Sequence, residues 1–241
     1  MIAKTDLPHL DSRHALFLDF DGTLAAIQDD PDTVTLPQAT GEALARLESL
    51  IGDAIAIISG RDIRDLSTRV PLSYWRAGGH GLEICAPGEA APQERASAPR
   101  SLSNAIDMIT RGLAGVRVED KGPVLAVHYR QAPALGEMLL ARIRDTLHDI
   151  PDYKAQAGKM VIEAKPAHAH KGRALERMMT HAPFRDRIPV MVGDDTTDED
   201  AFHVANRLGG FSIKVGPGET AARYRLDETV DVTNWLNEQG Q

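Results

Sequence analysis

Residues 16–24, LFLDFDGTL, constrain the fold of this chain more than any other segment. They form a short apolar run that ends in two carboxylates one residue apart, Asp19 and Asp21. Such a run is typical of a strand buried on both faces of a parallel sheet, and open α/β sheets bind ligands where these strands end. Two like charges this close are costly to bury without a cation or a proton. The segment therefore predicts a metal and a reactive carboxylate.

The composition is that of an ordinary globular protein. The 241 residues are 42% hydrophobic and 26% charged, enough to build one large domain or two small ones. The net charge of −8 argues against nucleic acid or a membrane surface as a partner, although a local group of cations can still bind a small phosphorylated substrate. No apolar stretch approaches the ~20 residues of a membrane span.

The cysteine content and the first residues of the chain bear on the cellular compartment. The single cysteine, Cys85, excludes an internal disulfide and suits a reducing compartment. The first residues lack the apolar core of a signal peptide. We therefore expect a cytoplasmic protein. A monomer is the default expectation, because no sequence feature sets the oligomeric state.

The hydrophobic pattern predicts an α/β fold with an insertion. A strand at 16–18, a helix at 36–50 and a strand at 54–58 form a βαβ unit, which indicates a parallel sheet. A connector rich in Pro and Ala follows at 86–100. The pattern of a parallel α/β sheet resumes after the insertion, with a helix predicted at 171–180 and a strand at 190–192.

The middle of the chain has a different pattern, which predicts a small antiparallel sheet with two helices on one face. Its elements are expected in the order helix, two strands, helix, two strands, at residues 101–113, 116–120, 124–130, 134–147, 153–157 and 160–164. We predict a Rossmann-like core of residues 1–87 and 167–241, and an inserted α/β domain of residues 88–166.

Acidic residues also follow the apolar run at 190–192. Because the carboxyl ends of parallel strands meet at one edge of a sheet, these acids are expected beside those at the end of the first strand. Carboxylate and hydroxyl oxygens fit octahedral Mg²⁺ better than a soft metal. This edge is predicted to carry a magnesium site whose donors come from Asp19, Asp21, Thr23, Asp194, Asp195 and Asp198.

Other residues at the same edge suit a phosphoryl group. Ser59 offers a hydroxyl and Lys171 a positive charge, while Gly22 lets the backbone and its N–H approach an anion. One carboxylate can act as a nucleophile, and a second with a raised pKa can protonate the leaving alcohol and activate water. Mg²⁺, Lys171 and Ser59 would neutralise the phosphoryl oxygens.

Four segments resemble the motifs of the haloacid dehalogenase-like (HAD) phosphohydrolase superfamily. These are LFLDFDGTL, IISGR, Lys171 and VGDDTTDEDAF, in the order of the four motifs. The resemblance implies that Asp19 is the nucleophile and Asp21 the general acid and base. It also implies a cap domain inserted between the second and third motifs.

The same resemblance assigns the remaining groups of the site. Asp194 would complete the Mg²⁺ site with the Asp19 side chain and the Asp21 carbonyl, helped by Asp195 or Asp198. The residues implied to bind the phosphoryl group are Gly22, Thr23, Ser59, Gly60 and Lys171.

Three further segments resemble the trehalose-6-phosphate phosphatases within this superfamily. They are GGHGLEI at 78–84, VEDKGPVLAVHYRQAP at 118–133 and GKMVIEAKP at 158–166. Residues two or four apart in a strand share a face, so the charged groups of the last two segments are expected to converge. The resemblance implies that the substrate is held by Arg61, His80, Glu119, Lys121, Arg130, Lys159 and Glu163. The chain departs from the family pattern with His170 before Lys171, and the roles of His168 and His170 stay open.

We therefore expect a Mg²⁺-dependent phosphatase that hydrolyses trehalose 6-phosphate, bound between core and cap, through an aspartyl phosphate. One alternative is a related phosphatase acting on sucrose phosphate or a mannosyl phosphoglycerate. Another is a non-catalytic sensor that binds a sugar phosphate or is phosphorylated on Asp19. Such switches lack a second acid placed like Asp21, which favours turnover.

Overall fold

The computed structural model describes residues 7–158 and 160–239. The chain divides into two compact units, each with its own hydrophobic core. The core unit comprises residues 1–91 and 170–241, and the inserted unit comprises residues 92–169. None of the helices in the described ranges is long and apolar enough to cross a membrane.

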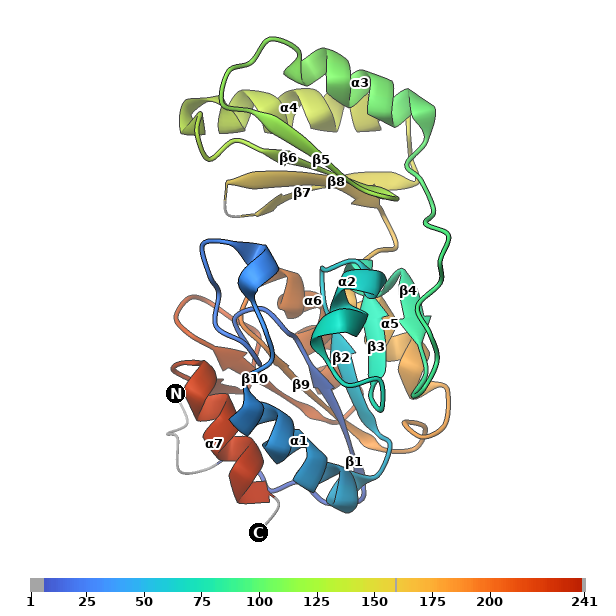
Figure 1. Ribbon diagram of the computed structural model, residues 1–241, viewed down its shortest axis with the longest axis vertical. Helices are drawn as coiled ribbons and strands as arrows, with labels where there is room; N and C mark the ends of the chain where they lie inside the picture. Colours follow the sequence, from blue (N-terminus) through green and yellow to red (C-terminus); the bar gives the residue numbers. More distant parts are fainter. Residues whose placement is uncertain (1–6, 159, 240–241) are drawn as a thin grey trace. The chain divides into compact units, whose positions relative to one another are not determined.

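Within the described residues, the core unit is built on a seven-stranded sheet (Figure 1). Every neighbouring pair of strands is parallel except β3 and β4. In spatial order the strands are β11 (Tyr224–Leu226), β10 (Phe211–Val215), β9 (Ile188–Gly193), β1 (His14–Leu18), β2 (Ile55–Ile58), β3 (Trp75–Gly78) and β4 (Glu83–Cys85).

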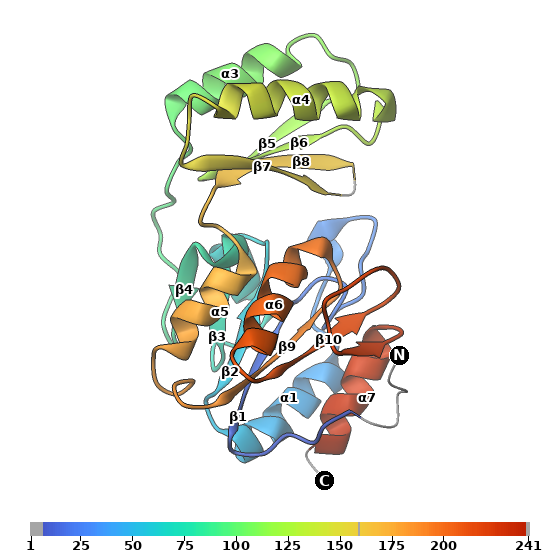
Figure 2. The same ribbon diagram turned by 180° about the vertical axis from the view of Figure 1, so that it is seen from behind.

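Helices cover both faces of this sheet. On β1, Leu16 and Leu18 pack into one hydrophobic cluster, whereas Ala15 and Phe17 pack into the other. The first cluster includes residues of α1 (Gln38–Ile51), α2 (Ile63–Arg69) and α7 (Thr229–Gln239). The second includes residues of α5 (Lys171–Met179) and α6 (Glu199–Arg207), which lie in front in Figure 2. Burial on both faces explains the unbroken apolar run of β1.

The inserted unit is an antiparallel sheet with helices on one face. The sheet order is β5 (Arg117–Lys121), β6 (Val124–His128), β8 (Val161–Pro166) and β7 (Tyr153–Gly158). The helices α3 (Arg100–Thr110) and α4 (Gly136–Leu147) pack against the alternate strand residues Leu125, Val127, Ile162 and Ala164. The predicted fold class, a parallel-sheet core with an inserted antiparallel sheet and two helices, is confirmed.

The expected helix at 36–50 begins two residues later than predicted. Pro37 is its N-cap residue, with an extended backbone (φ −61°, ψ 141°), and the helix starts at Gln38. A proline disfavours helical geometry at the residue before it, which excludes Leu36 from the helix. The loop between β1 and α1 also contains a short 3₁₀ turn, η2 (Pro31–Thr33).

Candidate active site

A buried lysine joins two acids at the carboxyl edge of the core sheet. Asp19 follows β1, and Lys171 is the first residue of α5. The Lys171 ammonium donates to Asp19 Oδ1 at 2.5 Å and to Asp198 Oδ1 at 2.7 Å. Asp198 ends the 3₁₀ turn η5 (Thr196–Asp198), which follows β9. All three side chains are at most 5% exposed, so water hardly screens their charges.

Asp194 completes an acidic cluster at this edge. One oxygen each from Asp19, Asp194 and Asp198 lies within 4.8 Å of the other two. No other such group occurs among the residues that the structure describes. Asp194 is fixed by close packing, because a Cβ on Gly22 would lie 2.2 Å from its Oδ2. A residue larger than glycine is therefore excluded at position 22.

The protonation of these groups reflects their burial. Burial raises the pKa of Asp19 well above its usual range, although the Lys171 charge opposes the shift. Burial likewise raises the pKa of Asp194, to about 6, with a contribution from the Asp198 charge. Burial disfavours the charged form of Lys171, but Asp19 and Asp198 outweigh it and raise its pKa. The single positive charge of Lys171 thus does not neutralise the negative charge that three ionised carboxylates would carry.

The cluster fits a hard metal ion. Asp194 Oδ1 is buried and has no hydrogen-bond partner among the described residues. A bound cation would satisfy that oxygen and lower the pKa values of Asp19 and Asp194. Three carboxylates are donors that hard divalent cations prefer.

Asp195 and Asp198, either of which was expected to help bind the metal, lie in different surroundings. Asp195 is exposed, and its Oδ1 accepts from the Thr196 N–H at 2.7 Å as the N-cap of η5. Asp198 is fully buried, and its Oδ2 accepts from the N–H groups of Asp194 and Asp195 at 3.1 and 3.0 Å. The structure brings Asp198 into the acidic cluster and leaves Asp195 outside it.

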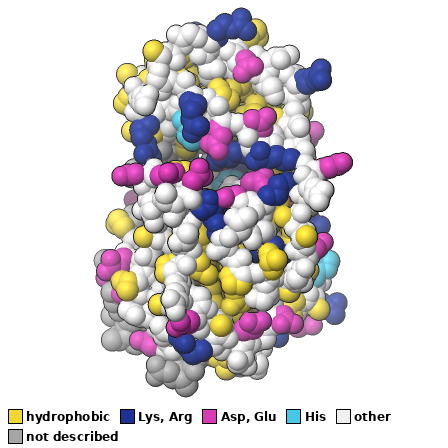
Figure 3. Space-filling model, viewed as in Figure 1, with side chains coloured by type: hydrophobic (Ala, Val, Ile, Leu, Met, Phe, Trp, Pro, Cys, Tyr) yellow, Lys and Arg dark blue, Asp and Glu magenta, His cyan; other side chains and the backbone are white. Residues whose placement is uncertain are grey.

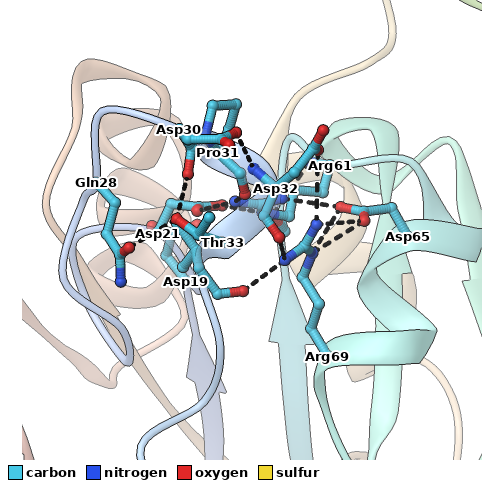
Figure 4. Close-up of polar contacts among 12 residues, drawn as sticks. Asp19, Asp21, Gln28, Asp30, Pro31, Asp32, Thr33, Arg61, Asp65 and Arg69 are labelled. Atoms are coloured by element: carbon cyan, nitrogen blue, oxygen red, sulfur yellow. Dashed lines mark hydrogen bonds and ion pairs between the residues drawn. The ribbon is translucent and has the colours of Figure 1, made fainter.

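The side chain of Asp21 lies against a guanidinium group (Figure 4). Arg61 Nε donates to Asp21 Oδ2 at 2.7 Å and its Nη2 to Oδ1 at 2.6 Å. Burial disfavours the Arg61 charge, but bonds to Asp21 and Asp65 outweigh it and raise its pKa. Arg61 was expected to bind substrate, and the structure places it on Asp21.

A second arginine and an aspartate extend this pair, and neither was singled out in the sequence. Asp65 accepts from Arg61 at 2.9 Å and from Arg69 at 2.7 Å. Arg61 also donates to the Pro31 carbonyl at 2.9 Å, and Arg69 to the Val34 carbonyl at 2.5 Å. Both arginines therefore hold the loop between β1 and α1 (Figure 4). The spacing of four from Arg61 to Asp65 to Arg69 is a helical-face signal that could have revealed the group.

Among the small and hydroxyl residues expected to bind phosphate, Thr23 contacts Asp19 directly. Thr23 Oγ1 donates to Asp19 Oδ2 at 3.4 Å. Ser59 is 1% exposed, and its Oγ accepts from the Arg61 N–H at 3.1 Å. The Gly22 N–H, expected to face an anion, donates to the Ala25 carbonyl at 2.7 Å.

Gly60 and His80 are in contact with each other. A Cβ on Gly60 would lie 2.8 Å from Cε1 of the His80 ring. His80 itself is 6% exposed and has a left-handed backbone (φ 59°). The ring thus packs on the glycine that follows Ser59.

His170 has a structural position. Its side chain accepts from the Arg173 N–H at 3.1 Å and caps α5, one residue before Lys171. A cap of this kind fixes the start of the helix, and with it the backbone of Lys171.

Some of the residues expected to bind the sugar form ion pairs within the inserted unit. Glu119 Oε2 lies 2.8 Å from His128 Nε2, and this hydrogen bond lowers the pKa of Glu119. Lys121 donates to Glu163 at 3.3 Å. Arg130 is exposed and makes no hydrogen bond or ion pair within the described ranges, and Lys159 lies outside the described residues.

The strand register adds one polar residue that sequence reasoning missed. A single row across the sheet contains Glu119, Ala126, Glu163 and Gln156. Ala126 lies between the two glutamates in this row, and Gln156 is the cross-strand neighbour of Glu163. On the face drawn in Figure 3, basic and acidic side chains are interspersed, without one large patch of a single sign.

Comparisons with known proteins cover almost the whole chain. A family model described as trehalose-phosphatase matches residues 17–230. The trehalose-6-phosphate phosphatase of Escherichia coli (strain K12) is 39% identical over 236 residues, which are 96% of this chain and 88% of that protein.

Solved structures resemble the chain in fold. The C-terminal domain of C. albicans trehalose-6-phosphate phosphatase matches with a TM-score of 0.78 and 26% identity, over 95% of this chain and 92% of that chain. A haloacid dehalogenase-like hydrolase from Bacteroides thetaiotaomicron matches with a TM-score of 0.67 and 13% identity, over 93% of this chain and 98% of that chain. At that identity the likeness concerns the fold alone.

Proposed function

Because the chain belongs to the trehalose-phosphatase family, within the HAD superfamily, we propose that it hydrolyses trehalose 6-phosphate to trehalose and phosphate. In this proposal the core unit is catalytic and the inserted unit is its cap. The observation that carries the proposal is the group around Asp19: a buried carboxylate bonded to Lys171 in an acidic cluster, with Asp21 two residues away.

The first step is phosphoryl transfer to Asp19. A carboxylate oxygen of Asp19 attacks phosphorus, an acyl-phosphate bond forms, and the bond between phosphorus and the sugar oxygen breaks. Asp21 donates a proton to the leaving sugar oxygen, because an alkoxide is a poor leaving group. To do so, Asp21 must enter this step protonated and therefore free of Arg61.

The second step releases phosphate. Asp21, now a carboxylate, removes a proton from water, and the water attacks the aspartyl phosphate. As the bond from the water oxygen to phosphorus forms, the bond between phosphorus and the Asp19 oxygen breaks, which regenerates the Asp19 carboxylate and releases inorganic phosphate. Lys171 offsets charge on Asp19 and the phosphoryl oxygens in both steps, while Thr23 and Ser59 supply hydroxyl groups near them.

We propose Mg²⁺ as the cofactor, held by Asp19, Asp194 and Asp198, with the Asp21 carbonyl as a further donor. When bound, Mg²⁺ supplies positive charge that favours transfer of the negatively charged phosphoryl group. The unpartnered oxygen of Asp194 supports a cation at this place.

We propose that the sugar is read by the inserted unit through Glu119, Lys121, Arg130, Lys159 and Glu163. Paired acids and bases can donate to and accept from many sugar hydroxyls at once. We also propose a monomeric, cytoplasmic enzyme, in which the buried free thiol of Cys85 suits a reducing compartment. Light scattering of the purified chain tests the monomer, and a dimer would contradict it.

The decisive experiment measures phosphate release from trehalose 6-phosphate with and without Mg²⁺, beside glucose 6-phosphate and sucrose 6-phosphate. Strong Mg²⁺-dependent release from trehalose 6-phosphate alone supports the proposal. Release from another sugar phosphate keeps the catalytic group and rejects the sugar assignment. No release with Mg²⁺ present, or full activity in Asp19→Asn, rejects the enzyme mechanism and favours the sensor.

A further inference from the structure

Lys214 is a buried cation that the proposed mechanism does not use. It lies on β10 and is 5% exposed. Its ammonium donates to the main-chain carbonyl of Asp194, and to that of Val215 at 2.9 Å. No carboxylate of the described residues forms an ion pair with it. A buried ammonium held mainly by carbonyl groups is costly to desolvate, which points to a specific use for this side chain.

The strand register explains how Lys214 reaches this carbonyl. Lys214 is paired with Gly193, the last residue of β9, and Asp194 comes next in the chain. The lysine therefore extends over the end of β9. It holds the peptide group that leads out of the strand into η5.

Asp194 is thus restrained on three sides. Its N–H donates to Asp198 Oδ2 at 3.1 Å, its carbonyl accepts from Lys214, and its side chain packs on the Cα of Gly22. One carboxylate oxygen, Oδ1, is buried without a hydrogen-bond partner among the described residues. The contacts fix the residue and leave this buried oxygen available to a cation.

We propose that Lys214 is a positioning residue for Asp194, which holds Oδ1 in the acidic cluster and so increases the affinity of the cluster for a divalent cation. The inference rests on the proposed function only in taking the cluster as the cation site. Two effects of Lys214 oppose each other. Its positive charge by itself weakens cation binding, whereas its bond to the Asp194 carbonyl strengthens binding by fixing the ligand. We assign the larger effect to positioning.

The sign of the change in Lys214→Met therefore tests the inference. Positioning predicts that the Mg²⁺ dissociation constant, measured by calorimetry without substrate, rises about tenfold, as for other residues that orient metal ligands. Raising the Mg²⁺ concentration is expected to restore most of kcat, because the reacting groups are intact. Lys214→Arg, which keeps charge and donor, is expected to recover part of the affinity.

Ser212→Ala is the matched control. Ser212 lies on the same face of β10, is fully buried and bonds to Asn206 Oδ1 at 2.9 Å, away from Asp194. Its Mg²⁺ affinity is expected to match that of the unmodified chain. If Lys214→Met does not fold, Lys214→Gln, which is too short to keep the contact, replaces it with the same expected loss.

Three outcomes overturn the inference. Unchanged or tighter Mg²⁺ binding in a folded Lys214→Met protein rejects positioning while leaving the proposed function intact. An equal loss in Ser212→Ala shows a general effect of disturbing β10. Failure of the unmodified chain to bind Mg²⁺ rejects the metal assignment itself, and the role of Lys214 with it.

Discussion

Arg61 donates to both carboxylate oxygens of Asp21, with Nε and Nη2 at 2.7 and 2.6 Å. In this arrangement both carboxylate oxygens of Asp21 accept from a guanidinium group, so neither is placed to donate a proton. The proposed reaction therefore requires the pair to separate before the leaving group departs. Because Asp65 and the Pro31 carbonyl also bind Arg61, separation moves Asp21 more easily than the arginine.

Asp21→Asn tests whether this residue acts as the general acid. We expect kcat/KM for trehalose 6-phosphate to fall at least about 100-fold, because the sugar alkoxide needs a proton. For p-nitrophenyl phosphate, whose leaving group needs none, the loss in kcat/KM should be much smaller. Steady-state kinetics with both substrates measures the difference, and equal losses would argue against the assignment.

The pair with Arg61 makes a related prediction. Arg61→Ala has two opposing effects: it removes the partner from which Asp21 must separate, and it removes the contact that holds Asp21 in place. We expect the loss of position to be the larger effect and to lower kcat/KM for trehalose 6-phosphate about tenfold. Arg69→Ala is the matched control, since Arg69 shares Asp65 but does not touch Asp21. A larger loss in Arg69→Ala than in Arg61→Ala would assign the effect to the loop instead.

Mg²⁺ binding is expected to weaken as the pH falls through about 6. Burial raises the pKa of Asp194 to about 6 in the metal-free protein, so protons compete with the cation below that pH. Above it, Asp194 is ionised and protons no longer compete for this ligand, while the raised pKa of Asp19 adds competition in the same direction. Calorimetric titrations from pH 5 to 8 measure this, and a constant dissociation constant across the range would contradict it.

Removing the buried ammonium of Lys171 should destabilise the metal-free protein. Lys171→Met leaves Asp19 and Asp198 without their partner, and breaking a buried pair costs about 3–5 kcal/mol of the free energy of unfolding. Urea unfolding in EDTA measures the loss. The comparison is Lys154→Met on β7, where an effect within about 0.5 kcal/mol is expected. Similar values for both variants would mean that the buried pair contributes little.

Glu163→Ala tests the sugar-reading role of the inserted unit. We expect KM for trehalose 6-phosphate to rise about tenfold or more, because the sugar loses the Glu163 carboxylate and Lys121 loses its ion-pair partner. The value of kcat/KM for p-nitrophenyl phosphate, which has no sugar, should stay within about twofold. Gln156→Ala, in the same cross-strand row, should give a smaller rise. A parallel loss on both substrates would indicate damage to the fold instead of lost sugar contacts.

The parts of the fold that the sequence predicts are those with unbroken apolar runs. Burial on both faces makes the strand before Asp19 and the strand before Asp194 visible as unbroken hydrophobic segments. β10 went unrecognised because Ser212 and Lys214 interrupt its apolar pattern. Both are buried because they bond to groups elsewhere in the fold, and a single sequence does not display those bonds.

Some features of the candidate site could also be predicted from the sequence, and others could not. The grouping of Asp19, Lys171 and Asp194 follows from where strands and helices end, so it could be anticipated. The bond between Arg61 and Asp21 joins residues forty positions apart and depends on side-chain direction, which spacing does not reveal. Likewise, only the geometry of η5 separates buried Asp198 from exposed Asp195.

The inserted unit also has a practical meaning for protein engineering. Residues 92–169 form one continuous stretch of chain with a hydrophobic core of its own. Exchanging the corresponding gene segment therefore replaces every proposed sugar contact of that unit in a single operation. The bonds among Asp19, Lys171 and Asp198 lie outside that stretch. If the inserted unit reads the sugar as proposed, libraries of exchanged segments would vary substrate choice while the proposed catalytic residues stay the same.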